Sequence, residues 1–151
     1  KYKSSVWDEV FSNLEAKGYS GFFILDYLSN RILNTFDGYH TYNPIKIERL
    51  NDKYKAASFK ANIKGKLFAA TVTPGYNDKV IRKNTGTYRD REGGDFYTNY
   101  WKMARSAKPD WILITSFNEW HEGTEIEPSE EYGEKYLEIT KKQSEKWKKK
   151  Q

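Results

Sequence analysis

The chain contains no cysteine, and this absence removes several kinds of chemistry at once. A disulfide framework, a thiolate zinc site and a cysteine nucleophile are all excluded, and the redox compartment is left open. Only two histidines are present, His40 and His121. So few imidazoles argue against a zinc centre built from histidine. Any chemistry must therefore come from other side chains.

Long apolar runs are also missing. None approaches the ~20 residues that a membrane helix needs. The first residues, Lys1 to Ser4, include neither a methionine nor a signal-like apolar block. We therefore expect no membrane segment in this stretch and an internal start, and the localisation is left open.

The formal net charge of +5 invites a nucleic-acid interpretation, but the excess lies in the last stretch, where lysines cluster between Lys141 and Lys150. Cations favour the C-terminal end of a helix, and no helix-turn-helix or base-stacking pattern accompanies these lysines. We therefore expect a solvated helix end and no nucleic-acid partner.

Helical and strand patterns alternate along the chain. The first helix is expected over 5–17, with a cap at Ser5 and with Val6, Val10 and Leu14 on its buried face. The remaining elements predicted are strands over 21–25 and 34–38, a helix that begins at Asn43 and Pro44, a strand over 66–72, a helix around 96–104 that Pro109 closes off, a strand over 111–115, and a final helix after Ser129 with Tyr136, Ile139, Gln143 and Trp147 on its inner face.

The predicted strands are continuous apolar runs, which is typical of strands covered on both faces. Strands joined by crossover helices form a parallel sheet, so the fold class is α/β, and nothing indicates a second domain. The loops that leave such strands open on one rim of the sheet. We expect three of them, "GYHTYNP", "TPGYNDKVIR" and "SFNEWHEGTEIEPS", to meet in space.

The last of these loops is strongly acidic. Its carboxylates could be solvated decoration, a calcium site built from Glu122, Glu125 and Glu127, or an acid and base that share one substrate. A zinc-protease helix is disfavoured, because "HEGTE" has Glu125 where the pattern needs a second histidine. Glu119 and Glu122 are three residues apart, which can bring two carboxyl groups to the ~5 Å separation of retaining glycosidases. Sugar rings stack on aromatic faces, which would explain the aromatic residues expected in the rim loops: Tyr39, Tyr42, Tyr76, Tyr88 and Trp120.

The stretch "ITSFNEWHEGTEIEPS", preceded by "FDGYHTY", "VTPGYNDKVIR" and "REGGDFY", resembles glycoside hydrolase family 99, the endo-α-1,2-mannosidases and endo-α-1,2-mannanases. The resemblance runs from about Phe36 to the end of the chain, with the motifs in the family's order. It implies a (β/α)8 TIM barrel, of which residues 1–151 would be the C-terminal half, with about four parallel strands and their crossover helices. The N-terminal half of the barrel would then be an expected partner of this stretch.

The resemblance also implies roles for individual residues. Glu122 would protonate the departing glycosidic oxygen and later act as the base toward water, and Glu119 would deprotonate the mannose 2-hydroxyl, giving a 1,2-anhydro sugar and net retention. No metal or cofactor is implied, and the substrate would be a mannose-containing oligosaccharide or polysaccharide. A noncatalytic carbohydrate-binding domain and a related polysaccharide-biosynthesis domain remain the alternatives. Residues that would contact the substrate are Tyr42, Tyr76, Arg82, Asn118 and Trp120.

Overall fold

The computed structural model describes residues 3–28 and 33–149 of the chain. Its main sheet has four parallel strands in the order β1-β2-β3-β6, so the predicted α/β class with a parallel sheet is confirmed. The strands are β1 (Ile24–Asp26), β2 (Gly38–His40), β3 (Leu67–Val72) and β6 (Trp111–Ile114). The helices are α1 (Ser4–Ala16), α2 (Leu50–Ile63), α3 (Asp95–Ser106) and α4 (Lys135–Lys148).

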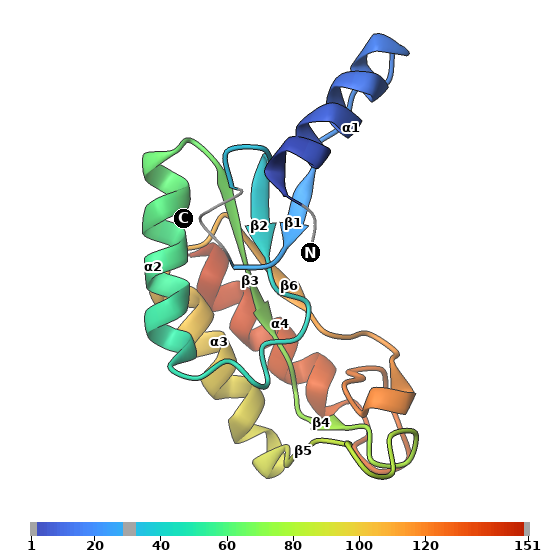
Figure 1. Ribbon diagram of the computed structural model, residues 1–151. Coiled ribbons are helices and arrows are strands. Elements are labelled where there is room, and N and C mark those ends of the chain that lie inside the picture. The colour runs from blue at the N-terminus through green and yellow to red at the C-terminus, as the bar shows by residue number, and fades with distance from the viewer. Residues whose placement is uncertain (1–2, 29–32, 150–151) are drawn as a thin grey trace.

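Figure 1 shows α2, α3 and α4 together on one side of the sheet, and α1 projecting away from the other helices. The polar segment after β3 contains a short antiparallel hairpin, β4 (Tyr76–Asn77) and β5 (Tyr88–Arg89), followed by a 3-10 turn, η1 (Glu92–Gly94). A second 3-10 turn, η2 (Trp120–Glu122), follows β6. The hairpin and η2 lie at the end of the sheet where the parallel strands finish (Figure 1).

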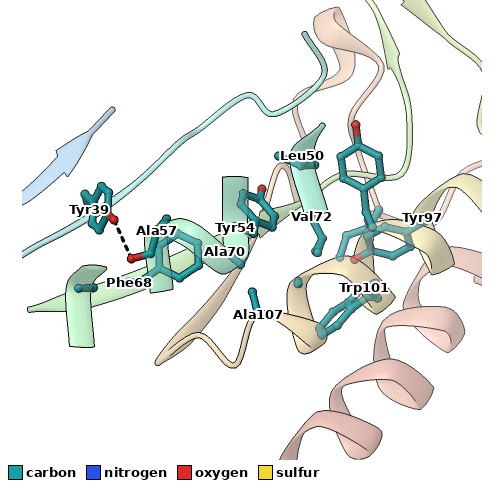
Figure 2. Close-up of a cluster of buried hydrophobic side chains, with 14 of the residues drawn as sticks. Tyr39, Leu50, Tyr54, Ala57, Phe68, Ala70, Val72, Tyr97, Trp101 and Ala107 are labelled. Carbon is teal, nitrogen blue, oxygen red and sulfur yellow. Dashed lines mark hydrogen bonds between the residues drawn. The ribbon is translucent and has the colours of Figure 1, made fainter. Parts of the chain in front are cut away.

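The centre of the sheet holds the core. Phe68 and Val72 of β3 are completely buried, and α2 and α3 pack against this strand. The tyrosines in this core keep their hydroxyl groups satisfied, because an unpaired buried hydroxyl is costly. Tyr54 donates to the Thr71 carbonyl at 2.6 Å, and Tyr39 donates to the Ala57 carbonyl at 2.7 Å (Figure 2).

Two aspartates hold the starts of the strands in register. Asp37 donates its backbone N–H to the Phe23 carbonyl at 2.9 Å, and its Oδ2 accepts the Phe23 N–H at 2.8 Å. Asp110 makes the same pair of hydrogen bonds to Phe68, at 2.9 Å and 2.8 Å. Each aspartate therefore adds a side-chain hydrogen bond to the parallel ladder just before a strand begins.

The outer strands are less buried than predicted. Only β3 is buried along nearly its whole length, whereas β1 is half-buried and Trp111 of β6 is 46% exposed. Among the described residues β1 pairs only with β2 and β6 only with β3, so each has one open edge. No helix lies between β1 and β2 in the part of this connection that the structure describes. Because β1 and β6 are partly exposed, the prediction that every strand is covered on both faces is wrong for this chain.

The first helix forms where predicted, but its cap and its buried face differ. It begins at Ser4, and no side-chain cap bond is present at the N-cap residue, Lys3. Val6 and Val10 are exposed, whereas Trp7 packs on Phe36 with ring centroids 5.6 Å apart. The aromatic rings decide the orientation, because they bury more apolar area than valine.

The second strand and second helix begin later than predicted. β2 occupies 38–40, so Tyr39, expected in a rim loop, is a strand residue that is only 1% exposed. Asn43 and Pro44 do form a turn, with Asn43 Oδ1 accepting the Ile45 N–H at 3.0 Å. The helix nevertheless starts only at Leu50, because Arg49 adopts a left-handed conformation with φ of 52°.

The C-terminal helix agrees with its predicted pattern. Tyr136 and Gln143 are buried, and Ile139 and Trp147 are half-buried. The described lysines of its last turns are exposed, as expected for a solvated helix end. Lys150, like Lys1 and Tyr2 at the other terminus, lies outside the described residues. Within 3–28 and 33–149, no helix has the length and apolar character to cross a membrane.

Candidate active site

The three rim loops meet, as predicted. Thr71, near the end of β3, donates its hydroxyl proton to the Thr41 carbonyl in the loop after β2. Thr115, directly after β6, donates to the Tyr42 carbonyl at 2.8 Å. The loop after β3 reaches the acidic loop through Tyr76, whose hydroxyl lies 3.1 Å from Glu122 Oε1. The polar ends of three neighbouring strands therefore form one site.

The acidic loop presents its glutamates around the turn η2. Glu119 precedes the turn, and its backbone N–H donates to Ser116 Oγ at 2.8 Å. Gly123 closes the turn with φ of 59°, and a Cβ there would lie 3.1 Å from the Asn77 backbone nitrogen. Glycine is needed at this point, because it accepts a positive φ and allows η2 to lie directly against β4.

Glu119 and Glu122 are held differently. The Glu119 side chain is 43% exposed, and the contact that the structure gives its carboxylate is to His121 Nδ1, 3.8 Å away. The Glu122 side chain is only 16% exposed, and its Oε1 accepts from Tyr76 at 3.1 Å and from Arg82 Nη1 at 3.3 Å. Its Oε2 is buried and has no hydrogen-bond partner among the described residues.

Tyr42 lies in the loop after β2, next to the acidic loop. The residue is 43% exposed. Its carbonyl accepts from Thr115, which directly precedes the acidic loop, at 2.8 Å. Burial raises the pKa of Tyr42, and the negative charges of Glu122 and Glu119 raise it further.

Tyr76 and Arg82, predicted to line the site, contact Glu122 and also a carboxylate that the sequence reasoning missed. Asp78 is only 4% exposed and accepts hydrogen bonds from both of them through Oδ2. Burial raises the pKa of Tyr76 to about 12, with help from its hydrogen bonds to Asp78 and Glu122. Burial alone would raise the pKa of Asp78, but hydrogen bonds from the Thr87 N–H, Arg82 and Tyr76 hold it below its usual value. Hydrogen bonds to Asp78, Glu122 and Tyr76 raise the pKa of Arg82.

The ion pair between Arg91 and Glu125, which the sequence did not predict, holds the acidic loop in place. Arg91 donates to the Glu125 carbonyl at 2.9 Å and to the Gly123 carbonyl at 3.2 Å, in addition to its ion pair with the Glu125 carboxylate. Its guanidinium group also lies over the rings of Tyr132 and Tyr136, at 4.4 Å and 4.5 Å. Burial raises the pKa of Glu125, although the charge of Arg91 opposes this. The "REGG" stretch was the available sequence signal, but nothing in it identified a buried partner.

The other predicted contact residues, Asn118 and Trp120, lie on the exposed side of the same loop. Trp120 is 48% exposed, and its indole N–H donates to Glu127 Oε2 at 2.9 Å. With Tyr76 and Tyr88 it lines a cavity of about 810 Å³ between the β4-β5 hairpin and the start of α4. Glu119 and Glu122 do not line this cavity, so it lies beside the glutamate pair and does not contain it.

The acidic side chains have partners other than a metal. Glu122 contacts Arg82, Glu125 contacts Arg91, and Glu127 contacts Trp120. Within the described ranges, no three or more histidine, aspartate and glutamate side chains are grouped so that they could hold an ion. What the arrangement offers chemically is one exposed carboxylate and one hydrogen-bonded carboxylate on the same turn. This combination suits an acid and a base acting on one substrate.

Comparison with known proteins gives a consistent answer. The profile of Glycosyl hydrolase family 99 matches residues 7–149. The glycoprotein endo-alpha-1,2-mannosidase of Mus musculus is 31% identical over 175 residues, covering 97% of this chain and 38% of that protein. The glycoprotein endo-alpha-1,2-mannosidase-like protein of Danio rerio is 34% identical over 136 residues, covering 81% of this chain and 31% of that protein.

A solved structure agrees with the sequence comparisons. The family 99 endo-alpha-mannosidase of Bacteroides thetaiotaomicron matches with a TM-score of 0.85 and 32% identity, covering 97% of this chain and 55% of that chain. The parallel sheet and its helices correspond to part of the (β/α)8 barrel of that enzyme. The chain thus spans about a third to about half of the length of these relatives. Because the family profile matches nearly the whole chain and the relatives exceed 30% identity, the chain belongs to glycosyl hydrolase family 99.

Proposed function

We propose that the protein containing this chain is a retaining, endo-acting glycoside hydrolase that cleaves internal α-1,2-mannosidic linkages in glycans or mannan. The family membership and the mannosidase names of the relatives support this substrate class. The observation that carries the proposal is the pair of carboxylates around η2: the Glu119 side chain is 43% exposed, and Glu122 is hydrogen-bonded to Tyr76 and Arg82.

In this proposal Glu122 is the general acid. Its Oε1 accepts hydrogen bonds from the Arg82 guanidinium group, so a proton on this carboxyl group resides on Oε2. That oxygen is buried in the chain without substrate, so donation requires the Glu122 side chain to turn toward the glycosidic oxygen on binding. The proton then goes to the departing oxygen as its bond to carbon 1 breaks.

Glu119 is the base in the same step. It takes the proton from the 2-hydroxyl of the mannose whose linkage is cleaved, and that oxygen attacks carbon 1 to form a 1,2-anhydro sugar. In the second step Glu122 takes a proton from water, the water oxygen attacks carbon 1, and Glu119 returns its proton to the 2-oxygen. Both carboxyl groups regain their starting protonation states, and the two inversions at carbon 1 give net retention.

The remaining site residues position the sugar or the acid. Tyr42 lies in the loop that Thr115 joins to the acidic loop, and it is proposed to contact the reacting mannose. Asn118 and Trp120 are exposed on the same loop and are proposed to contact neighbouring sugar units. Tyr76 and Arg82 contact the Glu122 carboxylate, so we propose that they act mainly on the acid.

We further propose that additional strands close a barrel around this sheet. The free edges of β1 and β6 and the greater length of the relatives support this. Closed barrels leave no strand edge open to solvent. Residues 1–151 would then form one half of a single catalytic domain, and the other half would supply the remaining wall of the site.

The test uses the full-length protein with Glu119→Gln and Glu122→Gln, and Glu145→Gln, an exposed position on α4, as the matched control. Each site variant should fold normally and lose about 10²–10⁴-fold in kcat on α-1,2-linked mannosyl oligosaccharides. A substrate with a fluoride leaving group needs no protonation and should partly rescue Glu122→Gln but not Glu119→Gln. Full activity in either site variant would end the assignment.

The same assay distinguishes the proposed hydrolase from the two alternative functions. A noncatalytic carbohydrate-binding domain would bind the oligosaccharides without hydrolysing them. Both glutamine variants would then leave its affinity for the oligosaccharides largely unchanged. A polysaccharide-biosynthesis protein would likewise release no product.

A further inference from the structure

Asp78 is a buried carboxylate with contacts on both oxygens. It follows β4 directly, and its Oδ1 accepts the backbone N–H of Thr87 at 2.5 Å. Its Oδ2 accepts from the Tyr76 hydroxyl at 3.1 Å and from Arg82 Nη1. One oxygen is therefore tied to the backbone of the hairpin, and the other to two side chains that also reach Glu122.

The hairpin loop that carries Arg82 is fixed by the same residue. The Arg82 backbone N–H donates to the Asp78 carbonyl at 2.8 Å, and the Asp78 N–H donates to the Thr87 carbonyl at 3.2 Å. The loop is also tight, because a Cβ at Gly86 would lie 2.6 Å from Lys79 Cα. Removing the Asp78 carboxylate would therefore affect the direction of the Arg82 side chain more than the path of the loop.

The Tyr76 hydroxyl lies at the same distance, 3.1 Å, from Asp78 Oδ2 and from Glu122 Oε1. It has one proton and cannot donate it to both carboxyl groups at once. A charged carboxylate is the stronger acceptor. The proton is therefore drawn to Asp78 when Glu122 is neutral and can be shared with Glu122 when that group is ionised.

Asp78 also balances the charge of Arg82. Without it, an uncompensated guanidinium group would face Glu122 and favour its ionised form, which cannot serve as an acid. Other charged groups also influence the ionisation of Glu122, but Asp78 is the carboxylate that forms an ion pair with Arg82, the cation that contacts Glu122. The titratable and charged groups that face Glu122 or its partner glutamate are Tyr42 after β2, Tyr76 on β4, Asp78 and Arg82 in the hairpin, and Glu119 and His121 around η2.

We propose that Asp78 is a positioning residue of the catalytic acid: it holds Arg82 and Tyr76 near Glu122 Oε1, neutralises Arg82, and accepts the hydrogen bond of the Tyr76 hydroxyl whenever Glu122 is protonated. This proposal rests on the proposed function, since it assumes that Glu122 alternates between its neutral and ionised forms. It assigns Asp78 no contact with the substrate.

The chain offers a matched control in the same hairpin. Asp90 stands two residues after Tyr88, as Asp78 stands two residues after Tyr76. Its carboxylate also accepts one tyrosine hydroxyl, at 2.6 Å, and one backbone N–H, that of Glu92. Asp90 is exposed and has no contact with Glu122 among those the structure gives. Asp90→Asn should therefore leave activity unchanged.

The experiment compares Asp78→Asn and Asp90→Asn in the full-length protein. We expect Asp78→Asn to lower kcat by about 10–100-fold with little change in KM, because a misdirected acid slows the chemical step. The alkaline limb of its pH–activity profile should move to lower pH, because the Arg82 charge is then no longer balanced by Asp78. On a substrate with a fluoride leaving group its defect should be several-fold smaller, since that departure needs no proton.

Equal losses on both substrates, or activity equal to that of Asp90→Asn, would overturn the proposal. Asp78→Ser, whose hydroxyl can still accept the Thr87 N–H, is the second neutral variant if Asp78→Asn does not fold. Failure of both to fold, while Asp90→Asn folds, would show a structural role and also overturn it. If Glu122→Gln is impaired and Asp78→Asn is not, only this inference fails; if Glu122→Gln is fully active, the proposed function fails.

Discussion

The guanidinium group of Arg91 lies 2.5 Å from the carboxylate of Glu125, and the two side chains are only 10% and 7% exposed. This pair joins the segment before η1 to the loop that carries Glu119 and Glu122. The same arginine reaches two backbone carbonyls of that loop, so one side chain fastens it at three points. The position of the glutamate pair therefore depends on an ion pair between residues 34 apart in sequence.

Arg91→Met should strongly destabilise the full-length protein. The substitution would leave the Glu125 carboxylate buried without its cation, which costs about 3–5 kcal/mol of the free energy of unfolding. Arg49→Met is the control, because the Arg49–Asp52 pair is 82% and 59% exposed and should contribute less than about 1 kcal/mol. Denaturant unfolding measures both. Similar small losses in the two variants would contradict the buried pair.

Tyr76 should make stability fall at high pH. Its pKa of about 12 in the folded chain lies above its ordinary value of 10.0, so the folded state keeps a proton that the unfolded state has released. The contribution is fully present below roughly pH 10 and is lost as the pH rises toward 12. The difference in free energy of unfolding between the natural protein and Tyr76→Phe should therefore shrink by up to about 2–3 kcal/mol across this window.

Denaturant unfolding of both proteins, measured between roughly pH 8 and pH 11.5, tests this difference. A difference that stays constant over the whole range would show that the Tyr76 hydroxyl is not held by burial and by its two carboxylate partners. The other tyrosines are the same in both proteins, so their titration cancels.

Activity should survive exhaustive metal chelation. Glu122, Glu125 and Glu127 each contact a protein donor, and three carboxylates that bound calcium would have to give up these contacts. The assay compares hydrolysis of α-1,2-linked mannosyl oligosaccharides by the full-length protein before and after chelator treatment and dialysis. Loss of activity that returns on adding calcium or zinc would show a metal site.

A polypeptide of only these 151 residues should self-associate and hydrolyse mannosyl oligosaccharides far more slowly than the full-length protein. Strands β1 and β6 each have an unpaired edge in the described chain. Phe22, two residues before β1, is 60% exposed, and Trp111, the first residue of β6, is 46% exposed. Open apolar edges favour pairing with another copy. Light scattering gives the mass in solution.

Substitutions should show whether the self-association depends on the edge strand β6 or on exposed aromatic residues in general. Trp111→Glu, at the start of β6, should weaken the self-association of the 151-residue polypeptide. Trp120→Glu should not, because Trp120 is similarly exposed, at 48%, but lies in the turn η2 and not in a strand. A stable monomer that cleaves oligosaccharides at nearly the full-length rate would refute the half-barrel proposal.

The sequence alone was sufficient for the types of the four long helices and the four strands of the main sheet, and for the rim that carries the site. The β4-β5 hairpin and the turns η1 and η2 lie in segments that were expected to be loops. Apolar periodicity identified β3, α3 and α4, because a buried face must be apolar whatever it packs against. Parallel strands then required the loops after β2, β3 and β6 to share one end of the sheet, and they do. The spacing of the glutamates in "NEWHE", together with the family resemblance, predicted Glu119 and Glu122 as the catalytic pair.

Tertiary contacts decided what periodicity could not. Helix α1 packs with the face that carries Trp7 and Phe11, whose rings contact Phe36. Strand β2 lies at 38–40, later than predicted, because Tyr39 packs under α2 and donates to the Ala57 carbonyl. No local pattern marks Asp78 or Arg91 as buried. Arg91 is buried because Glu125, 34 residues later in the sequence, is brought against it. The partners of Asp78 are nearby in sequence, but only the folded hairpin brings them onto its carboxylate. The cost of burying a charge depends on the partner that the fold supplies.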